Sequence, residues 1–215
     1  MTPPTPTQRS YDSTRRRARA QESRARILDA ARALFVESGY AATTLASIAE
    51  RADVALPTLY AAFGSKGKLL ATLLDERPGE PETQVQILTA DQLAEIKALP
   101  DAEAKLDLFA SLVAAHLERW CDLLVALRVA GCVEGEAATI EVKRRDDEYA
   151  LIRQLGQHLR SSGLLKADLS AATATDTLWA LSDVQLFTML VRTRGWRLSR
   201  YRSWLADSLT AVLVG

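Results

Sequence analysis

Apolar residues recur at helical spacing along most of this sequence, and no run alternates between apolar and polar residues as a half-buried β-strand would. The clearest short pattern begins at residue 45 and predicts a helix of about two turns. The hydroxyl of Thr43 or Thr44 is placed to cap its first turn. The apolar positions of this helix, spaced i, i+3, i+4 and i+7, are Leu45, Ile48, Ala49 and Ala52.

A second short helix is predicted over residues 56–63, because Leu59 and Phe63 lie four residues apart and Pro57 suits a first helical turn. The turn between the two helices is short, and Asp53 within it tolerates a left-handed backbone. So short a connection swings the second helix across the first, which is the geometry of a helix-turn-helix. The outward side chains are small enough for a DNA major groove, and they are Pro57, Thr58, Tyr60 and Ala61.

Longer apolar patterns flank these two helices. One predicts a helix over residues 17–38 that Gly39 ends, and another predicts a helix over residues 66–76 that Ser65 caps. Two prolines and a glycine follow within residues 77–82, so we place a domain boundary there. The expected parts are a disordered basic arm over residues 1–16, a helix-turn-helix domain over 17–76 and a second helical domain over 77–215.

The second domain is also predicted to be all-helical, which makes the whole chain all-α. Turn residues separate its apolar-periodic stretches, and Asp101, Ser170 and Ser199 are the readable helix caps. One stretch shows a possible break near Trp120 and is predicted to stop around Gly131. The predicted helices cover residues 84–99, 101–129, 137–161, 170–194 and 199–213.

The stretch from Arg24 to about Glu76 resembles the DNA-binding domain of the tetracycline-repressor (TetR) family of transcription regulators. In that family the recognition helix ends in T-L-Y-x-x-F and S-K-x-x-L follows, as in residues 58–63 and 65–69 here. Asp53 departs from the family's usual Gly at the turn, and Ala55 from its usual Ser at the helix cap. The resemblance implies a ligand-responsive DNA-binding regulator, usually a repressor, that binds an inverted-repeat operator as a homodimer.

The charge distribution changes the picture that the total charge gives. The chain has 27 basic and 27 acidic residues, a formal net charge of zero, which at first argues against nucleic acid. Residues 1–26, however, hold seven arginines against two acidic residues, a net charge of +5 that the rest of the chain balances. Such an arm is suited to the phosphate backbone, although a solvated tail without a partner is the alternative.

Candidate DNA contacts follow from the motif and the arm. We expect Thr44, Tyr60 and Lys66 to contact phosphates, and the small residues of the second helix to contact bases, above all thymine methyl groups. The arm is expected to reach an adjacent minor groove. The base-contact candidates are Leu56, Pro57, Thr58 and Ala61, and the arm candidates are Arg15, Arg16 and Arg17.

The predicted helix over residues 170–194 is apolar on more than one side, so it must be covered on two sides. One cover is the chain's own core, and the other is expected to be a second copy, as the resemblance also implies. A central helix in a monomer is the alternative. The candidate dimer residues are Leu178, Leu181, Tyr201, Trp204, Leu205 and Leu209.

A small-molecule pocket is expected among polar or aromatic residues embedded in the apolar faces of the C-terminal helices. Ordinary core packing is the alternative for each of them. Asp183 is the sharpest candidate, because a carboxylate in an apolar run must be paired, exposed or facing a cavity. A cationic ligand would bind it, whereas with an apolar or acidic ligand it would pair with an arginine. The candidates are His116, Trp120, Tyr149, Trp179, Asp183 and Phe187, with Cys121, Gln185 and Met189 beside them.

Other classes of protein fit less well. His116, Cys121 and Asp183 form a catalytic triad only on paper, because the sequence has no nucleophile elbow, phosphate loop or metal-spaced cluster. We therefore expect no enzyme, no cofactor and no metal. An all-helical adaptor that uses its helix-turn-helix for protein contacts is the remaining alternative. The effector and the operator sequence are not readable from the sequence.

Cellular location follows from cysteine usage and from the absence of long apolar runs. Cys121 and Cys132 fit no metal-binding spacing and are expected to be buried thiols, as in a reducing cytoplasm. No apolar run reaches the roughly 20 residues that span a bilayer, and the N-terminus does not resemble a signal peptide.

Overall fold

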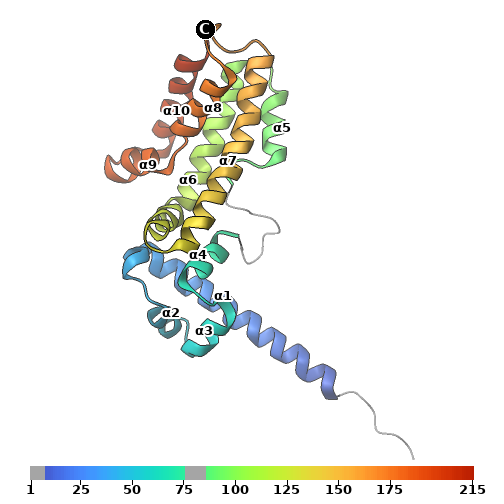
Figure 1. Cartoon of the computed structure of the whole chain (residues 1–215), viewed down its shortest axis with the longest axis vertical. Helices are drawn as coiled ribbons and strands as arrows, with labels where there is room; N and C mark the ends of the chain where they lie inside the picture. The colour runs from blue at the N-terminus through green and yellow to red at the C-terminus, as the bar shows by residue number, and fades with distance from the viewer. Residues whose placement is uncertain (1–7, 76–85) are drawn as a thin grey trace, which may run out of the picture. The chain divides into compact units, whose positions relative to one another are not determined.

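The computed structural model describes residues 8–75 and 86–215, and all regular structure in this part of the chain is helical (Figure 1). The predicted all-α class is therefore confirmed. The chain divides into two compact units, residues 1–82 and 83–215. The predicted boundary lies in residues 77–82, which are outside the described residues, so its position stays a prediction.

The N-terminal unit is built on one long helix, α1, against which α2 and α4 pack, while α3 packs against α2 and α4 (Figure 1). The two predicted helices of the helix-turn-helix are present with the predicted bounds within one residue. The elements are α1 (Gln8–Ala42), α2 (Leu45–Arg51), α3 (Leu56–Phe63) and α4 (Lys66–Asp75).

Helix α1 begins earlier than the sequence predicts. It begins at Gln8 and includes Arg15, Arg16 and Arg17, part of which was expected to lie in a disordered arm. Arginine, alanine and glutamine favour helix strongly, so this segment continues the helix although it has no apolar face of its own. Residues 1–7 of the predicted arm lie outside the described residues.

The far end of α1 matches its prediction. Gly39 interrupts the helix with a φ of 76°, a conformation that glycine adopts without steric cost. Tyr40 then turns back, and its ring stacks on Phe35 with centroids 5.5 Å apart. This turn fixes where α2 begins.

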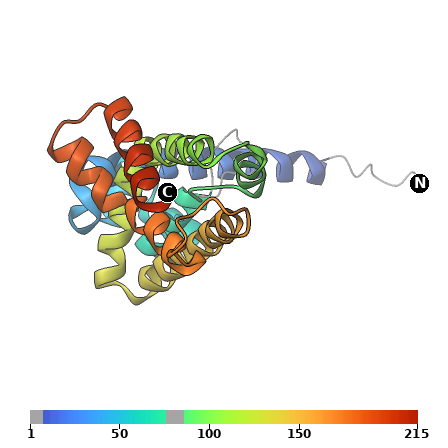
Figure 2. The same cartoon turned by 90° about the horizontal axis from the view of Figure 1, so that it is seen from above.

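The C-terminal unit is a bundle around two long helices, α6 and α7, with α5, α8 and α10 packed beside them (Figures 1 and 2). Helix α6 runs unbroken past Trp120 and through Gly131, where the sequence predicts a break or an end. The elements are α5 (Ala90–Ala98), α6 (Ala102–Val133), α7 (Gly135–Ser161), α8 (Ala171–Leu181), α9 (Val184–Phe187), the π-helical turn η1 (Thr188–Thr193) and α10 (Leu198–Leu213).

The predicted helix over residues 170–194 is divided into three pieces. Helix α8 ends at Leu181, and the backbone of Asp183 is extended, with φ −66° and ψ 137°. The Asp183 carboxylate accepts a hydrogen bond from the Gln185 N–H at 2.8 Å and so caps α9. Because the apolar pattern continues through the break, the sequence shows no sign of it.

Two of the three predicted caps of this unit are confirmed. Asp101 accepts a hydrogen bond from the Ala104 N–H at 2.8 Å, and Ser170 accepts one from the Thr173 N–H at 3.0 Å. The prediction for Ser199 is wrong, because α10 begins at Leu198 and Ser199 lies inside its first turn.

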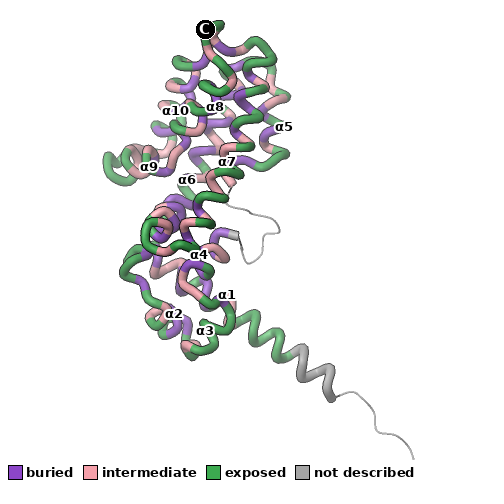
Figure 3. Tube along the Cα trace, viewed as in Figure 1, coloured by how far each residue is buried: buried purple, intermediate pink, exposed green. Residues whose placement is uncertain are grey.

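The core of the C-terminal unit lies between the facing sides of its helices (Figure 3). Helices α7 and α8 approach closely at Gly156, where a methyl group would lie 2.4 Å from the Thr175 hydroxyl and 3.1 Å from the Ala171 carbonyl. The Thr175 hydroxyl is itself held by a 2.7 Å hydrogen bond to that carbonyl. Only glycine therefore fits here without moving a backbone.

Replacing Gly156 by alanine is expected to lower the free energy of unfolding by up to about 2 kcal/mol, because the added methyl group overpacks the α7–α8 contact, which by itself costs about 1–3 kcal/mol. The gain in helix propensity, about 1 kcal/mol, opposes this loss and does not cancel it. Urea denaturation followed by tryptophan fluorescence measures the effect. Gly135→Ala is the control, since a methyl group there meets nothing within 4 Å. Equal stability of the two variants would contradict the close approach.

Candidate functional site

The first helix of the helix-turn-helix begins with a complete capping box. The Thr44 hydroxyl accepts a hydrogen bond from the Ser47 N–H at 3.0 Å, and the Ser47 hydroxyl accepts one from the Thr44 N–H at 3.1 Å. Thr43, the other cap candidate, is buried and donates instead to the carbonyls of Leu34 and Gly39. Thr44 is thus the cap, and it remains exposed.

The turn between α2 and α3 has the predicted left-handed residue. Asp53 has a φ of 51°, and its carboxylate lies 3.5 Å from the guanidinium of Arg26 on α1. The Val54 N–H closes the turn on the Ala49 carbonyl at 3.0 Å. Asp53 therefore takes the place that glycine usually holds in this motif, at the modest cost that an aspartate pays there.

Helix α3 has one buried side and one exposed side. Leu59 and Phe63 are buried, and the guanidinium of Arg24 lies 4.6 Å from the centre of the Phe63 ring. The Ala55 position gives the helix no side-chain cap, as its sequence requires. Pro57, Thr58, Tyr60 and Ala61 are exposed, and Leu56 is half-buried. The side predicted to contact bases is thus accessible, and the contacts themselves remain predictions.

Lys66 is placed differently from the other predicted phosphate contacts. Its ammonium group donates to the carbonyls of Tyr40 at 2.9 Å and Thr43 at 3.0 Å, and it lies 4.1 Å from the centre of the Tyr40 ring. These carbonyls belong to the end of α1 and the residues after it, where the helix leaves them without an internal partner. Lys66 holds α4 against this end of α1, so its ammonium is engaged inside the protein.

Replacing Lys66 by methionine should destabilise the N-terminal unit by about 1–3 kcal/mol, because two carbonyls lose a charged hydrogen-bond donor. Hydrogen exchange of the full chain, measured by mass spectrometry, would show faster exchange in α1 and α4. Lys68→Met, on the exposed side of the same helix, is the control. Weaker DNA binding with unchanged exchange would instead support the phosphate contact that the sequence predicts.

The predicted ligand residues of the C-terminal unit separate into two groups. His116, Trp179 and Asp183 line one small cavity. Tyr149 lies beside it, since its ring meets Trp179 edge to face at 5.8 Å and its hydroxyl donates to Asp176 at 2.8 Å. Trp120 and Phe187 do not line this cavity and are buried in the core.

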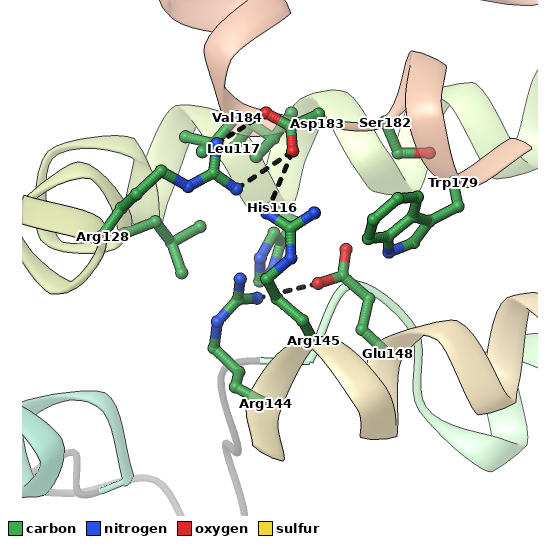
Figure 4. Close-up of a pocket in the computed structure, with 11 residues that line it drawn as sticks. His116, Leu117, Arg128, Arg144, Arg145, Glu148, Trp179, Ser182, Asp183 and Val184 are labelled. Atoms are coloured by element: carbon green, nitrogen blue, oxygen red, sulfur yellow. Dashed lines mark hydrogen bonds and ion pairs between the residues drawn. The ribbon is translucent and has the colours of Figure 1, made fainter. Parts of the chain in front are cut away.

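The cavity is dominated by charged residues that the sequence reasoning missed (Figure 4). Four charged residues of α7 are spaced i, i+3, i+4 and i+7. This spacing is the sequence signal that places them on one face of the helix. A charged face of a helix is more often solvated, so the spacing alone does not identify these residues as a buried site. The α7 residues are Glu141, Arg144, Arg145 and Glu148, of which the last three line the cavity together with Arg128 of α6.

These charges form a continuous chain of ion pairs, called here the ion-pair cluster and comprising Arg128, Glu141, Arg144, Arg145, Glu148 and Asp183. Figure 4 shows these residues except Glu141. Arg128 binds both oxygens of Asp183, at 2.9 and 3.0 Å. Arg144 donates to Glu141 at 2.9 and 3.2 Å and to Glu148 at 2.8 Å. Arg145 lies farther from Asp183, at 3.5 Å, and its guanidinium is 4.5 Å from the centre of the Trp179 ring.

The protonation states follow from this packing. Burial and the nearby Arg144 lower the pKa of His116 to about 3, so its imidazole is neutral at physiological pH. Burial raises the pKa of Glu148, although Arg144 opposes the change. Burial also acts to raise the pKa of Asp183, but the hydrogen bonds from Arg128 and Gln185 outweigh it and hold this pKa below its ordinary value.

The cavity enclosed by these residues measures about 10 Å³, which is room for about one water molecule. A larger ligand therefore has to displace a side chain of the ion-pair cluster or of its aromatic wall. Among the described residues, no group of three metal-ligating side chains occurs. Asp183 is hydrogen-bonded to Arg128, and the Cys121 thiol contacts the Thr188 hydroxyl at 3.3 Å. The described residues therefore do not form the catalytic triad of His116, Cys121 and Asp183.

Most of the predicted dimer residues face the interior of their own unit. Leu178, Tyr201, Leu205 and Leu209 are fully buried within it, so their side chains are not available to a second copy. Leu181 and Trp204 are half-buried and remain the accessible apolar positions of the dimer prediction. Val212 of the last helix is also exposed. Cys132 is exposed, which corrects the expectation that both cysteines are buried.

None of the described helices has the length and the apolar composition that crossing a membrane requires.

The helix-turn-helix matches known proteins at the level of sequence. A family model described as "Bacterial regulatory proteins, tetR family" matches residues 27–73. The transcriptional regulator TtgR of Pseudomonas putida is 46% identical over 61 residues, which cover 28% of this chain and 29% of TtgR. The transcriptional repressor KstR of Rhodococcus jostii is 52% identical over 54 residues, 25% of this chain and 26% of KstR. The matched segment thus spans less than a third of the length of these relatives.

A solved structure matches over most of the chain. It is a protein from Saccharomonospora viridis in complex with choline, with a TM-score of 0.69, 22% identity, and coverage of 91% of this chain and 99% of that one. At this identity the match shows the fold alone. These findings show that residues 27–73 form a helix-turn-helix domain of the kind found in the tetR family of bacterial regulatory proteins, and that the chain has the fold of the Saccharomonospora viridis protein.

Proposed function

We propose that this protein is a transcriptional regulator, acting as a repressor, that binds an inverted-repeat DNA operator as a homodimer. The observation that carries this proposal is helix α3. Its apolar side is fixed in the core by Leu59 and Phe63, while Thr58, Tyr60 and Ala61 are presented to solvent. A recognition helix needs this combination of a fixed orientation and an accessible side.

The division of work on DNA follows from the chemistry of these side chains. Thr44 and Tyr60 have exposed hydroxyl-bearing side chains suited to phosphates. Pro57 and Ala61 offer carbon atoms and suit thymine methyl groups better than guanine edges. Helix α3 thus supplies few hydrogen-bond donors to bases, and positioning contacts carry a large share of the affinity.

The arginines near the start of α1 supplement these contacts. Arg15, Arg16 and Arg17 are exposed on a helix, so they present their charges along one rigid support. Guanidinium groups are favoured in narrow A·T-rich minor grooves, where the negative potential is enhanced. We therefore assign to them the groove next to the one that α3 enters.

Dimerisation and control by a ligand complete the proposal. Two helix-turn-helix units related by a two-fold axis would enter successive major grooves about 34 Å apart. The Saccharomonospora viridis neighbour was solved with choline, which supports a small-molecule site in proteins of this fold. A ligand that binds more tightly to one arrangement of the dimer shifts the DNA affinity by that difference. We place this regulator in the cytoplasm, with its DNA.

Replacing Tyr60 by alanine should abolish operator binding and leave the fold unchanged, because this side chain is 52% exposed. Fluorescence anisotropy with DNA from the protein's own promoter measures binding, and light scattering checks the oligomeric state. Tyr60→Phe is the matched variant, since it keeps the ring and removes only the hydroxyl. Retained sequence-selective binding by Tyr60→Ala would overturn the assignment of α3, and unselective binding by the wild type would favour an adaptor.

Replacing Arg15, Arg16 and Arg17 together by alanine should flatten the dependence of log K on log salt concentration by about 0.9 for each phosphate that the variant no longer touches. The same anisotropy titration at a series of salt concentrations gives this slope. Arg153, Arg197 and Arg200, exposed in the C-terminal unit, form a control triple whose replacement removes the same charge. An arm variant with the wild-type slope would show that these arginines do not contact DNA.

A further inference from the structure

In the ion-pair cluster the carboxylates already accept hydrogen bonds from arginines, whereas Arg145 has N–H groups for which no hydrogen bond is found within the described residues. We propose that the cluster binds a small carboxylate ligand, with Arg145 holding the carboxylate and Trp179 packing against an apolar, flat remainder. The proposal deepens the proposed function, on which it rests for the ligand's regulatory role, by naming the chemical class of the effector.

The carboxylates of the cluster are already well bound. Asp183 receives two hydrogen bonds from Arg128 and one from the Gln185 N–H. Glu141 receives two from Arg144, and Glu148 receives one from the same guanidinium. A cationic ligand would thus have to compete with bidentate arginine pairs at Asp183 and Glu141, and with a single arginine hydrogen bond at Glu148.

Arg145 is held much less firmly than the other two arginines. A guanidinium has five N–H donors, and the one hydrogen bond found for Arg145 within the described residues, to Asp183, is 3.5 Å long, at the outer limit for such a bond. Its side chain is 28% exposed, so it is accessible from solvent. When Arg145 turns toward a ligand, Asp183 still keeps both of its bonds to Arg128.

The aromatic wall argues for the same ligand class. The guanidinium of Arg145 covers the face of Trp179 at 4.5 Å, so the position that a ligand cation would take is occupied by the chain's own cation. A flat carboxylic acid can exchange with it, because its ring replaces the guanidinium on Trp179 while its carboxylate pairs with the displaced Arg145. The rings of Tyr149 and Trp179 are nearly perpendicular, with their centres 5.8 Å apart.

The size of the cavity makes this exchange necessary. With room for about one water molecule, the cavity accepts a ring only after Arg145 has moved. The movement changes the contacts of Asp183, which caps α9 at the break that follows α8. Ligand binding is thereby connected to the beginning of α9 through the side chain of Asp183.

The test is isothermal titration calorimetry of the full chain with benzoate as the probe. Benzamide has the same shape without the charge, and benzyltrimethylammonium carries the opposite charge. Saturable binding of benzoate at millimolar concentration, with neither of the other two binding, is the expected result. Preference for benzyltrimethylammonium, or no saturable binding of benzoate, would overturn the proposal.

Arg145→Gln should weaken benzoate binding about 10- to 100-fold, because it removes a charged hydrogen-bond donor pair. Arg200→Gln is the matched control, since it also removes an arginine from the face of a tryptophan, Trp196, at 3.9 Å. Equal affinity of Arg145→Gln and the wild type would contradict the assignment of Arg145.

A second variant tests the aromatic wall without removing a charge. Trp179→Phe should keep benzoate binding within a fewfold and lose the fluorescence change that benzoate produces in the wild type. An unchanged fluorescence response would place the ligand elsewhere.

Because no DNA is present in these titrations, they test the ligand site independently of the proposed function. Failure of promoter binding would contradict the proposed function and leave the ligand site unaffected.

Discussion

The ends of helices impose the constraint on which both units depend. Each helix leaves its last carbonyls and first N–H groups without internal partners, and in a chain made of helices many such ends are buried. Lys66 meets this requirement for α1 by donating to the carbonyls of Tyr40 and Thr43. Lys105, almost fully buried, does the same for α5 through the carbonyls of Ile96, Lys97 and Leu99. In both units a lysine ammonium therefore fixes the angle at which the next element leaves.

Asp183 provides a hydrogen-bond acceptor for a free N–H group at the beginning of α9. Its carboxylate caps α9, and in doing so it brings a negative charge to a half-buried place between helices. Such a charge is tolerated only when it is paired, and Arg128 provides the pairing. A helix cap and an ion pair thus share one side chain. For this reason the break in the helix and the charged cavity are parts of a single arrangement.

Sequence reasoning succeeded where a pattern is local. The bounds of α2 and α3 and the left-handed Asp53 depend on neighbouring residues, so periodicity and turn chemistry predict them, and cap chemistry narrows the cap of α2 to Thr43 or Thr44. Sequence reasoning failed where a side chain forms a hydrogen bond with a residue that is distant in the chain. Nothing near Lys66 shows that it reaches a carbonyl 26 residues earlier, and nothing near Arg128 shows that it meets Asp183, 55 residues later. Tyr201 in the C-terminal unit is a second example. The sequence predicts that it contacts a second copy, but its own unit buries it, because α10 packs along α6. Whether a side chain faces water is decided by tertiary packing, and a periodic pattern shows only which residues share a face.

Apart from Tyr60, the exposed side of α3 lacks long polar side chains, so in the proposed complex with DNA its selectivity has to come from the accurate placement of small ones. A methyl group no longer reaches its base when a helix rotates or shifts by a small distance, whereas a long arginine adjusts to such a change. The burial of Leu59 and Phe63 and the cover of Phe63 by Arg24 supply that accuracy. If α3 reads DNA as proposed, the packing beneath it is therefore as much a determinant of recognition as the residues on its exposed side.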